Sequence, residues 1–128
     1  MRLLLDTHSL IWWLLNDPRL SRRAFAYVSD PEHDIVVSAA TAWEIATKHR
    51  IGKLPEAASL VHDFTLHVAR EGFAMMDLTV AHAMRAGRLP GVHRNPFDRM
   101  LAGQSLEENL PLVSGDQVFD DLGASRLW

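Results

Sequence analysis

MRLLLDTH, residues 1–8, joins a short apolar run to an acid at the point where a helix is predicted to begin. An apolar run without polar alternation is typical of a strand covered on both faces, as in parallel sheets. Asp6 directly follows this strand, so we expect its carboxylate at the carboxyl edge of the sheet, where ligands bind in open α/β folds. Taken alone, Asp6 is explained equally well as the N-cap of the next helix.

Three further acids lie at similar junctions along the chain. Glu44 comes shortly after an apolar run at 35–38, Asp98 lies near the start of NPFDRMLAGQS, and Asp116 follows a run at 112–114. Carboxylates gathered at one sheet edge repel one another unless a cation neutralises them. Oxygen-rich clusters of this kind suit Mg²⁺ or Mn²⁺. We therefore predict a shared metal site for phosphodiester chemistry, formed by Asp6, Glu44, Asp98 and Asp116.

Each of these acids also has a local explanation. Glu44 could complete a capping box with Thr41, and Asp98 could complete one with Asn95. Asp116 lies in Ser-Gly-Asp, a sequence typical of turns. The recurrence of acids after separate strands favours a shared site over independent caps, but whether Glu44 is a ligand, a base or mainly a cap stays open.

The pattern of apolar runs and stop signals predicts alternating strands and helices. The expected strands are 2–5, 35–38, 73–78, 112–114 and 125–127, and the expected helices are 8–16, 21–29, 41–50, 56–70, 79–86 and 95–109. Such alternation predicts an α/β fold, a three-layer α/β/α sandwich with a short, mostly parallel sheet of four or five strands. At 128 residues we expect one domain, residues 1–128.

Composition excludes several classes of protein. The chain has no cysteine, which excludes disulfides, thiolate metal sites and cysteine nucleophiles. No two histidines have the spacing of a helical zinc site. The longest apolar run, Leu10 to Leu15, is far too short to span a bilayer, and Asp6 interrupts any signal-like segment. We therefore expect a soluble, cytoplasmic protein without membrane contact.

The net charge of −3 is unusual for a protein that binds nucleic acid. Without the four candidate ligands, 13 basic residues stand against 12 acidic ones, because the chain has 16 acids in all. Basic residues also cluster at 48–53 and at 85–99. A metal site between two basic rims could hold a phosphate backbone, although each cluster is explained equally well by solvated helix ends. Ser114, Arg94 and Arg99 are the candidate phosphate contacts.

At this point the sequence resembles the PIN-domain ribonucleases, and among them the VapC-type toxins of bacterial toxin–antitoxin pairs. The resemblance rests on four motifs that span the chain: Asp6-Thr7-His8, Ser38 with Thr41 and Glu44, Asn95-Pro-Phe-Asp98-Arg with Ala102 and Gln104, and Ser114-Gly-Asp116. It implies a PIN-like fold in which Asp6, Glu44, Asp98 and Asp116 bind Mg²⁺ or Mn²⁺ and cleave RNA. Ser114 stands where that family usually has threonine, so the hydroxyl is kept.

The same resemblance implies an endoribonuclease that acts as the toxin of a type II toxin–antitoxin system, held inactive by an antitoxin and forming a homodimer. Leu10 to Leu15 covers the full circumference of a helix, so part of it needs cover beyond the sheet. Residues 24–28 of the same chain could supply this cover. Contact with a partner protein is the favoured interpretation.

Other classes fit less well. A haloacid-dehalogenase-type phosphatase needs a second acid where His8 stands, and it also needs a late lysine, whereas the only lysines are Lys48 and Lys53. A response-regulator receiver domain fails for similar reasons. Two alternatives remain: a non-catalytic PIN-fold module that acts through a protein partner, and a metal-dependent DNA nuclease.

Overall fold

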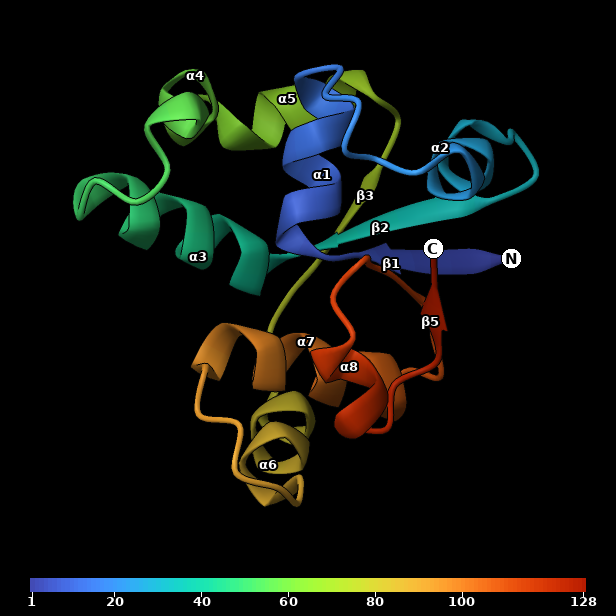
Figure 1. Cartoon of the computed structure of the whole chain (residues 1–128), viewed down its shortest axis with the longest axis vertical. Helices are drawn as coiled ribbons and strands as arrows, with labels where there is room; N and C mark the ends of the chain where they lie inside the picture. The colour runs from blue at the N-terminus through green and yellow to red at the C-terminus, as the bar shows by residue number, and fades with distance from the viewer.

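The computed structural model describes all 128 residues and is built on a parallel sheet with strand order β3-β2-β1-β4-β5 (Figure 1). The strands are β1 (Arg2–Leu5), β2 (Asp34–Ser38), β3 (Ala74–Met76), β4 (Leu112–Val113) and β5 (Arg126–Leu127). The α-helices are α1 (Thr7–Leu14), α2 (Arg22–Ser29), α3 (Ala39–Arg50), α4 (Ala58–Val61), α5 (Phe64–Arg70), α6 (Val80–Arg88), α7 (Pro96–Glu107) and α8 (Val118–Asp121). A 3₁₀ turn, η1 (Pro55–Ala57), precedes α4.

Alternate residues of the central strands enter two different cores. Leu4, Val36 and Leu112 pack with residues of α7 and α8 on one face of the sheet. Leu3 and Ile35 pack with residues of α1, α2 and α5 on the other face. Because side chains alternate along a strand, an unbroken apolar run fills both cores at once. Figure 1 shows the resulting layers, with α1, α2, α4 and α5 above the sheet and α6, α7 and α8 below it. The predicted α/β/α sandwich is confirmed.

The order of the strands creates a switch point beside β1. The chain passes from β1 to β2 and β3 on one side, and then crosses to β4 and β5 on the other. Leu4 and Leu5 pair in parallel register with Leu112 and Val113 of β4. The carboxyl ends of β1 and β4 therefore lie side by side at the crevice where open α/β sheets bind ligands.

Three expectations about individual elements were wrong. The helix expected at 56–70 is divided into η1, α4 and α5, because His62 is extended and Asp63 has a positive φ of 59°. The break lets α4 pack against Ile11 and Ile45 while α5 packs on the sheet. The helix expected from Thr41 begins earlier, at Ala39, and the short α8 was missed.

The strand expected at 73–78 is shorter and less buried than the sequence suggested. β3 pairs only with β2, at the end of the sheet, and Met75 is exposed. An edge strand has no neighbour on one side, so its apolar residues need not be covered on both faces.

The apolar run in α1 is covered largely by the chain itself. Leu10 and Ile11 are buried, while Trp13 packs its ring against Phe25 of α2 at a centroid distance of 5.2 Å. Trp12 packs on Trp128 at 5.9 Å. Part of the cover expected from residues 24–28 is therefore present. No helix of the structure is long and apolar enough to cross a membrane.

Candidate active site

Asp6 lies at the carboxyl end of β1 and is both a helix cap and a buried acid. Its Oδ1 accepts a hydrogen bond from the Ser9 backbone N–H at 2.7 Å, which makes it the N-cap of α1. Its Oδ2 accepts a hydrogen bond from the hydroxyl of Ser114. Burial raises the pKa of Asp6, and the hydrogen bonds from Ser114 and Ser9 act in the opposite direction. The cap and the site interpretations of Asp6 are thus compatible.

Ser114 connects Asp6 to Asp116 across the switch point. The Ser114 hydroxyl accepts a hydrogen bond from the Asp116 backbone N–H at 3.0 Å while it donates to Asp6. Asp116 is exposed, and its Oδ1 accepts a hydrogen bond from the Val118 backbone N–H at 3.0 Å. One carboxylate oxygen of Asp116 is therefore hydrogen-bonded within the local turn, to the backbone of Val118.

Glu44 is not a capping residue. The N-cap of α3 is Ser38, whose hydroxyl accepts a hydrogen bond from the Ala40 N–H, so Glu44 lies in the second turn. Its buried carboxylate accepts a hydrogen bond from Thr7 Oγ1 at 2.5 Å and pairs with Lys48 one turn further along α3. The capping-box interpretation of Glu44 is therefore wrong, because the helix starts before Thr41.

Asp98 lies in the first turn of α7. Asn95 caps this helix by accepting hydrogen bonds from the N–H groups of Phe97 and Asp98 at 2.9 and 3.3 Å. The Asp98 carboxylate contacts Nε2 of His93 at 2.8 Å. Burial raises the pKa of Asp98, the negative charges of Glu44 and Asp116 raise it further, and His93 lowers it. The charges of two other candidate ligands thus act on Asp98.

A buried polar network fixes α7 against the start of α3. Ser38 Oγ donates a hydrogen bond to Gln104 Oε1 at 2.5 Å, and the Gln104 side-chain nitrogen lies 3.3 Å from Nδ1 of His82 in α6. All three side chains are buried. Because unpaired buried polar groups are costly, this network restricts how the two helices that carry Glu44 and Asp98 can lie.

The two candidate arginines differ in their surroundings. Arg99 donates hydrogen bonds to the backbone carbonyls of Leu89 and His93, the latter at 3.0 Å, and so ties down the segment between α6 and α7. Arg94, in that segment, is exposed and has no carboxylate partner. Arg94 is therefore free to contact a phosphate, whereas Arg99 is engaged in holding the loop.

The donor chemistry of the four acids fits a hard cation, since all four groups are carboxylates. Burial raises the pKa of Asp98 most, and the charges of Glu44 and Asp116 raise it further. As the side chains lie, however, no three His, Asp or Glu residues are close enough to hold a metal ion. The carboxylate of Glu44 is paired with Lys48, and the carboxylate of Asp98 is paired with His93. A bound cation would have to replace these two contacts.

Three residues contact the candidate ligands in a way that the sequence did not predict. Thr7 donates to Glu44, Lys48 pairs with Glu44, and His93 contacts Asp98. The spacing of Glu44 and Lys48, four residues apart on one helix, is a usable signal for an ion pair. The contact of Thr7 with Glu44 joins α1 to α3 across the fold, so no local spacing indicates it. His93 lies only five residues before Asp98, but in an irregular segment where spacing alone does not predict a contact.

The sequence matches the PIN domain family over residues 3–124. It is 38% identical over 88 residues to "Ribonuclease VapC16" of Mycobacterium tuberculosis (strain ATCC 25618 / H37Rv). That match covers 62% of this chain and 60% of the relative, so the matched region is well short of the relative's full length.

Two solved structures are similar to this fold along almost the whole chain. One is VapBC2 from Rickettsia felis bound to a DNA fragment from their promoter, with a TM-score of 0.73 and 15% identity, covering 99% of this chain and 98% of that chain. The other is VapBC-1 from nontypeable Haemophilus influenzae, with a TM-score of 0.69 and 16% identity, covering 99% and 97%. At these identities the likeness is one of fold.

Proposed function

The chain belongs to the PIN domain family, and from that premise we propose that it is a metal-dependent endoribonuclease acting as the toxin of a type II toxin–antitoxin system. The proposal draws on the similarity to a ribonuclease of the VapC type and on the similarity in fold to VapBC complexes. The site observation that best supports it is the position of Asp98, whose partly buried carboxylate lies within electrostatic reach of Glu44 and Asp116: burial raises the pKa of Asp98 most, and the charges of these two acids raise it further.

In this proposal Asp6, Glu44, Asp98 and Asp116 hold Mg²⁺, or Mn²⁺ in its place. When bound, such an ion lowers the pKa of a water molecule and stabilises negative charge on the scissile phosphate. The four acids supply the negative charge that draws the ion to this edge. Their own repulsion is relieved at the same time, so binding and neutralisation favour one another.

The remaining polar residues position the acids and the substrate. Ser114 holds Asp6 by its hydroxyl, and Thr7 holds Glu44 in the same way. Arg94 steadies a non-bridging phosphate oxygen, since it is exposed beside Asn95 and has no acidic partner. Arg99, which we also assign to substrate binding, acts chiefly by keeping the loop of Arg94 in place. No residue of the chain is needed as a nucleophile.

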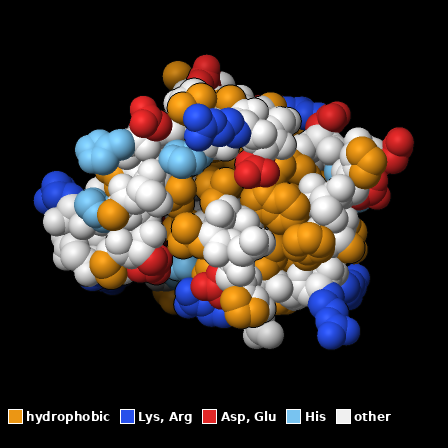
Figure 2. All heavy atoms as spheres, turned by 90° about the horizontal axis from the view of Figure 1, so that it is seen from above, with side chains coloured by type: hydrophobic (Ala, Val, Ile, Leu, Met, Phe, Trp, Pro, Cys, Tyr) orange, Lys and Arg blue, Asp and Glu red, His pale blue; other side chains and the backbone are white.

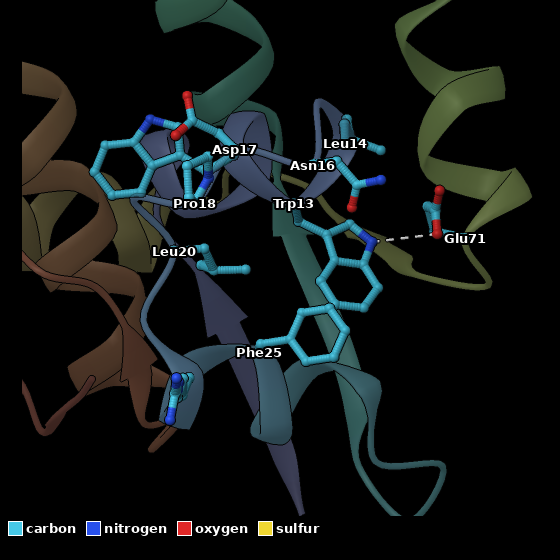
Figure 3. Close-up of a pocket in the computed structure, with 10 residues that line it drawn as sticks. Trp13, Leu14, Asn16, Asp17, Pro18, Leu20, Phe25 and Glu71 are labelled. Carbon is cyan, nitrogen blue, oxygen red and sulfur yellow. Dashed lines mark hydrogen bonds between the residues drawn. The ribbon is translucent and has the colours of Figure 1, made fainter.

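An antitoxin is the proposed protein partner, and a pocket between α1 and α2 is the proposed place of contact. The pocket has a volume of about 620 Å³ and is lined by residues that include Trp13, Leu20 and Phe25. In Figure 3 the Trp13 ring lies against Phe25 and its indole nitrogen donates to Glu71, at 3.2 Å. Figure 2 shows hydrophobic side chains gathered at the centre of the face that carries α1, with charged groups around it. We also propose that the chain forms a homodimer, as VapC-type toxins do.

Cleavage of a defined RNA tests the proposal. Purified protein should cut an end-labelled RNA hairpin with single-stranded flanks in the presence of Mg²⁺ or Mn²⁺, and should stop when EDTA is added. A single-stranded DNA of the same sequence distinguishes the DNA-nuclease alternative. Asp98→Asn keeps the size of the side chain but removes its charge, so it should reduce cleavage by two or more orders of magnitude and should weaken Mn²⁺ binding in calorimetry.

The Asp98→Asn protein, purified identically, is the control for contaminating nuclease. Equal cleavage by this variant and the wild type would contradict the proposal. Absence of cleavage by the wild type, together with tight binding of a co-encoded protein, would favour the non-catalytic module instead.

A further inference from the structure

A second cleft lies between the end of α3 and the start of α7, the two helices that carry Glu44 and Asp98. It is shallow and open to solvent, with a volume of about 370 Å³. Thr47, Lys48 and Lys53 line one side, and Arg94 and Phe97 line the other. The cleft draws its walls from two segments that are more than 40 positions apart in the sequence.

The charge of this cleft is opposite to that of the whole chain. Lys48, Lys53 and Arg94 line it, and no acidic residue does, although the net charge of the protein is −3. Lys48 is engaged with Glu44. Lys53 and Arg94 are both exposed and form no ion pair. Two unneutralised cations therefore face the same space, as in grooves that follow a nucleic-acid backbone.

An exposed aromatic surface adjoins these cations. Trp43 packs edge-on against Phe97, with ring centroids 4.5 Å apart and an interplanar angle of 67°. Phe97 is almost fully covered, whereas Trp43 is 50% exposed. A half-exposed tryptophan anchored on a buried ring offers a rigid flat face, and bases of any type stack on such faces.

The cleft is continuous with the proposed active site through two contacts. Lys48 pairs with Glu44 and also lies 5.9 Å from the centre of the Phe97 ring. Phe97 immediately precedes Asp98 in α7. Lys48 and Phe97 therefore link the cleft to two of the four acids, Glu44 and Asp98.

We propose that this cleft is a nucleotide subsite for single-stranded RNA, in which Lys53 and Arg94 contact backbone phosphates and Trp43 stacks on a base next to the cleaved bond. The inference rests on the proposed ribonuclease function and adds which surface holds the flanking nucleotide. Stacking is tolerant of base identity, and single-stranded segments are the RNA features whose bases are free to stack. An acidic protein segment would use the two cations but has no need of the tryptophan face.

Binding of a fluorescein-labelled ten-residue oligouridylate, measured by anisotropy in EDTA, tests the subsite without cleavage. Trp43→Leu keeps apolar packing on Phe97 and should lower affinity roughly 5- to 150-fold, the range found for loss of one stacked base. Trp43→Phe should restore most of the binding. Lys53→Ala should instead reduce the slope of log affinity against log salt by about 0.7, which corresponds to one phosphate contact on a single strand.

Matched controls lie outside the cleft and outside the pocket between α1 and α2. Leu66 of α5 is 47% exposed, so Leu66→Ala shortens an exposed apolar side chain elsewhere, and Arg23→Ala removes an exposed cation elsewhere. Neither control should change RNA affinity. Thermal unfolding of each variant excludes loss of fold as the cause of any effect.

The outcomes separate this inference from the proposed function. If the wild type cleaves RNA and the Trp43→Leu and Lys53→Ala variants bind and cleave RNA equally well, the subsite is overturned and the nuclease proposal stands. Wild type that binds the oligouridylate through Trp43 and Lys53 but never cleaves would support the subsite and remove the nuclease. Equal affinity for a labelled ten-residue polyglutamate, unaffected by Trp43→Leu, would show a general anion surface and overturn the assignment.

Discussion

At the scale of single residues, Glu44 shows how a local sequence pattern can suggest the wrong role, here that of a helix-capping residue. Thr41 and Glu44 have the spacing of a capping box, but the structure caps α3 with Ser38 and leaves Glu44 buried beside Thr7 and Lys48. The spacing carries no information on where the helix begins. The shared site of four acids stays a prediction, supported for Glu44 by the effect of its charge on the pKa of Asp98, which burial raises most.

The pair of Glu44 and Lys48 leads to a prediction about stability. Glu44→Gln should abolish most cleavage and also destabilise the metal-free protein by roughly 1–3 kcal/mol, because Lys48 loses its partner in a half-buried place. The double variant Glu44→Gln with Lys48→Met should recover part of this loss, since neither charge remains. Urea denaturation in EDTA of the wild type, the two single variants Glu44→Gln and Lys48→Met, and the double variant measures the coupling free energy between Glu44 and Lys48. A fully active Glu44→Gln enzyme would show that Glu44 has no role in the chemistry.

Asp98 should make the metal-free protein less stable as the pH rises. Its pKa in the folded protein is raised above the ordinary 3.8, so the folded state holds the proton more tightly than the unfolded chain. The stabilisation is fully present below 3.8 and is lost as the pH rises through the raised value. Asp98→Asn cannot ionise and does not incur this loss. In EDTA it should therefore melt higher than wild type at pH 7.5, and the difference should narrow towards pH 4.5.

The contact of His93 with Asp98 acts against this effect, because it favours the ionised carboxylate. His93→Ala is compared in the same pH scan. At pH 7.5 it should melt lower than wild type, so its melting temperature should differ more from that of Asp98→Asn than the wild-type value does. A melting temperature of Asp98→Asn below that of wild type at every pH would contradict the prediction.

At the scale of elements, the strands were predictable and the breaks between helices were not. The apolar run at residues 2–5 matches β1 because a central strand needs apolar residues on both faces. The division of 56–70 depends on two separate cores, one around Ile45 and one on the sheet. The break falls at His62 and Asp63, and neither is a glycine or a proline. Tertiary packing therefore determines where the helix ends.

The contact between α6 and α7 gives a prediction in which two glycines have opposite effects. A Cβ added at Gly103 of α7 would lie 2.9 Å from the backbone nitrogen of Ala86, whereas one added at Gly87 of α6 meets nothing within 4 Å. Gly103→Ala should therefore destabilise by about 1–3 kcal/mol through overpacking. Gly87→Ala should stabilise by about 0.5–1 kcal/mol, the usual gain in a helix.

Urea denaturation of both variants measures the two effects side by side. Gly103→Ala should also weaken cleavage, because a displaced α7 moves Asp98 relative to Glu44. If both substitutions stabilise the protein equally, α6 and α7 are not in the close contact described here.

At the scale of the whole molecule, charge is distributed so that the two proposed interfaces differ. Three cations and no acid line the cleft between α3 and α7, while the pocket between α1 and α2 combines the aromatic rings of Trp12, Trp13 and Phe25 with charged residues of both signs. Net charge alone argued against nucleic-acid binding, and only the arrangement of charges in three dimensions explains how an acidic chain could hold RNA. The sequence indicated the segments of both interfaces, Leu10 to Leu15 with residues 24–28 and the basic clusters at 48–53 and 85–99, but the folded chain alone shows that residues 47–53 and 94–97 line one cleft.

The same arrangement predicts that toxicity and its relief depend on different surfaces. Expression of the chain alone should arrest bacterial growth, and a co-encoded antitoxin should relieve the arrest by covering the α1–α2 pocket. The sequence pointed to the run from Leu10 to Leu15 as the contact. The rings of Trp12 and Trp13 in this run are packed within the chain, and Phe25 is the more exposed aromatic at that pocket. Phe25→Ser should therefore weaken the complex while the chain stays toxic.

Met84→Ser is the matched control, because Met84 is 57% exposed on α6, at the far side of the sheet from α2. It should leave antitoxin affinity unchanged. Affinity measured by calorimetry, with growth rescue as the second readout, separates the two surfaces. If rescue is lost with Met84→Ser and kept with Phe25→Ser, the antitoxin binds at α6 and not at the α1–α2 pocket. The reason is that an interface loses affinity when a side chain that becomes buried at its centre is removed, and not when an exposed side chain elsewhere is removed.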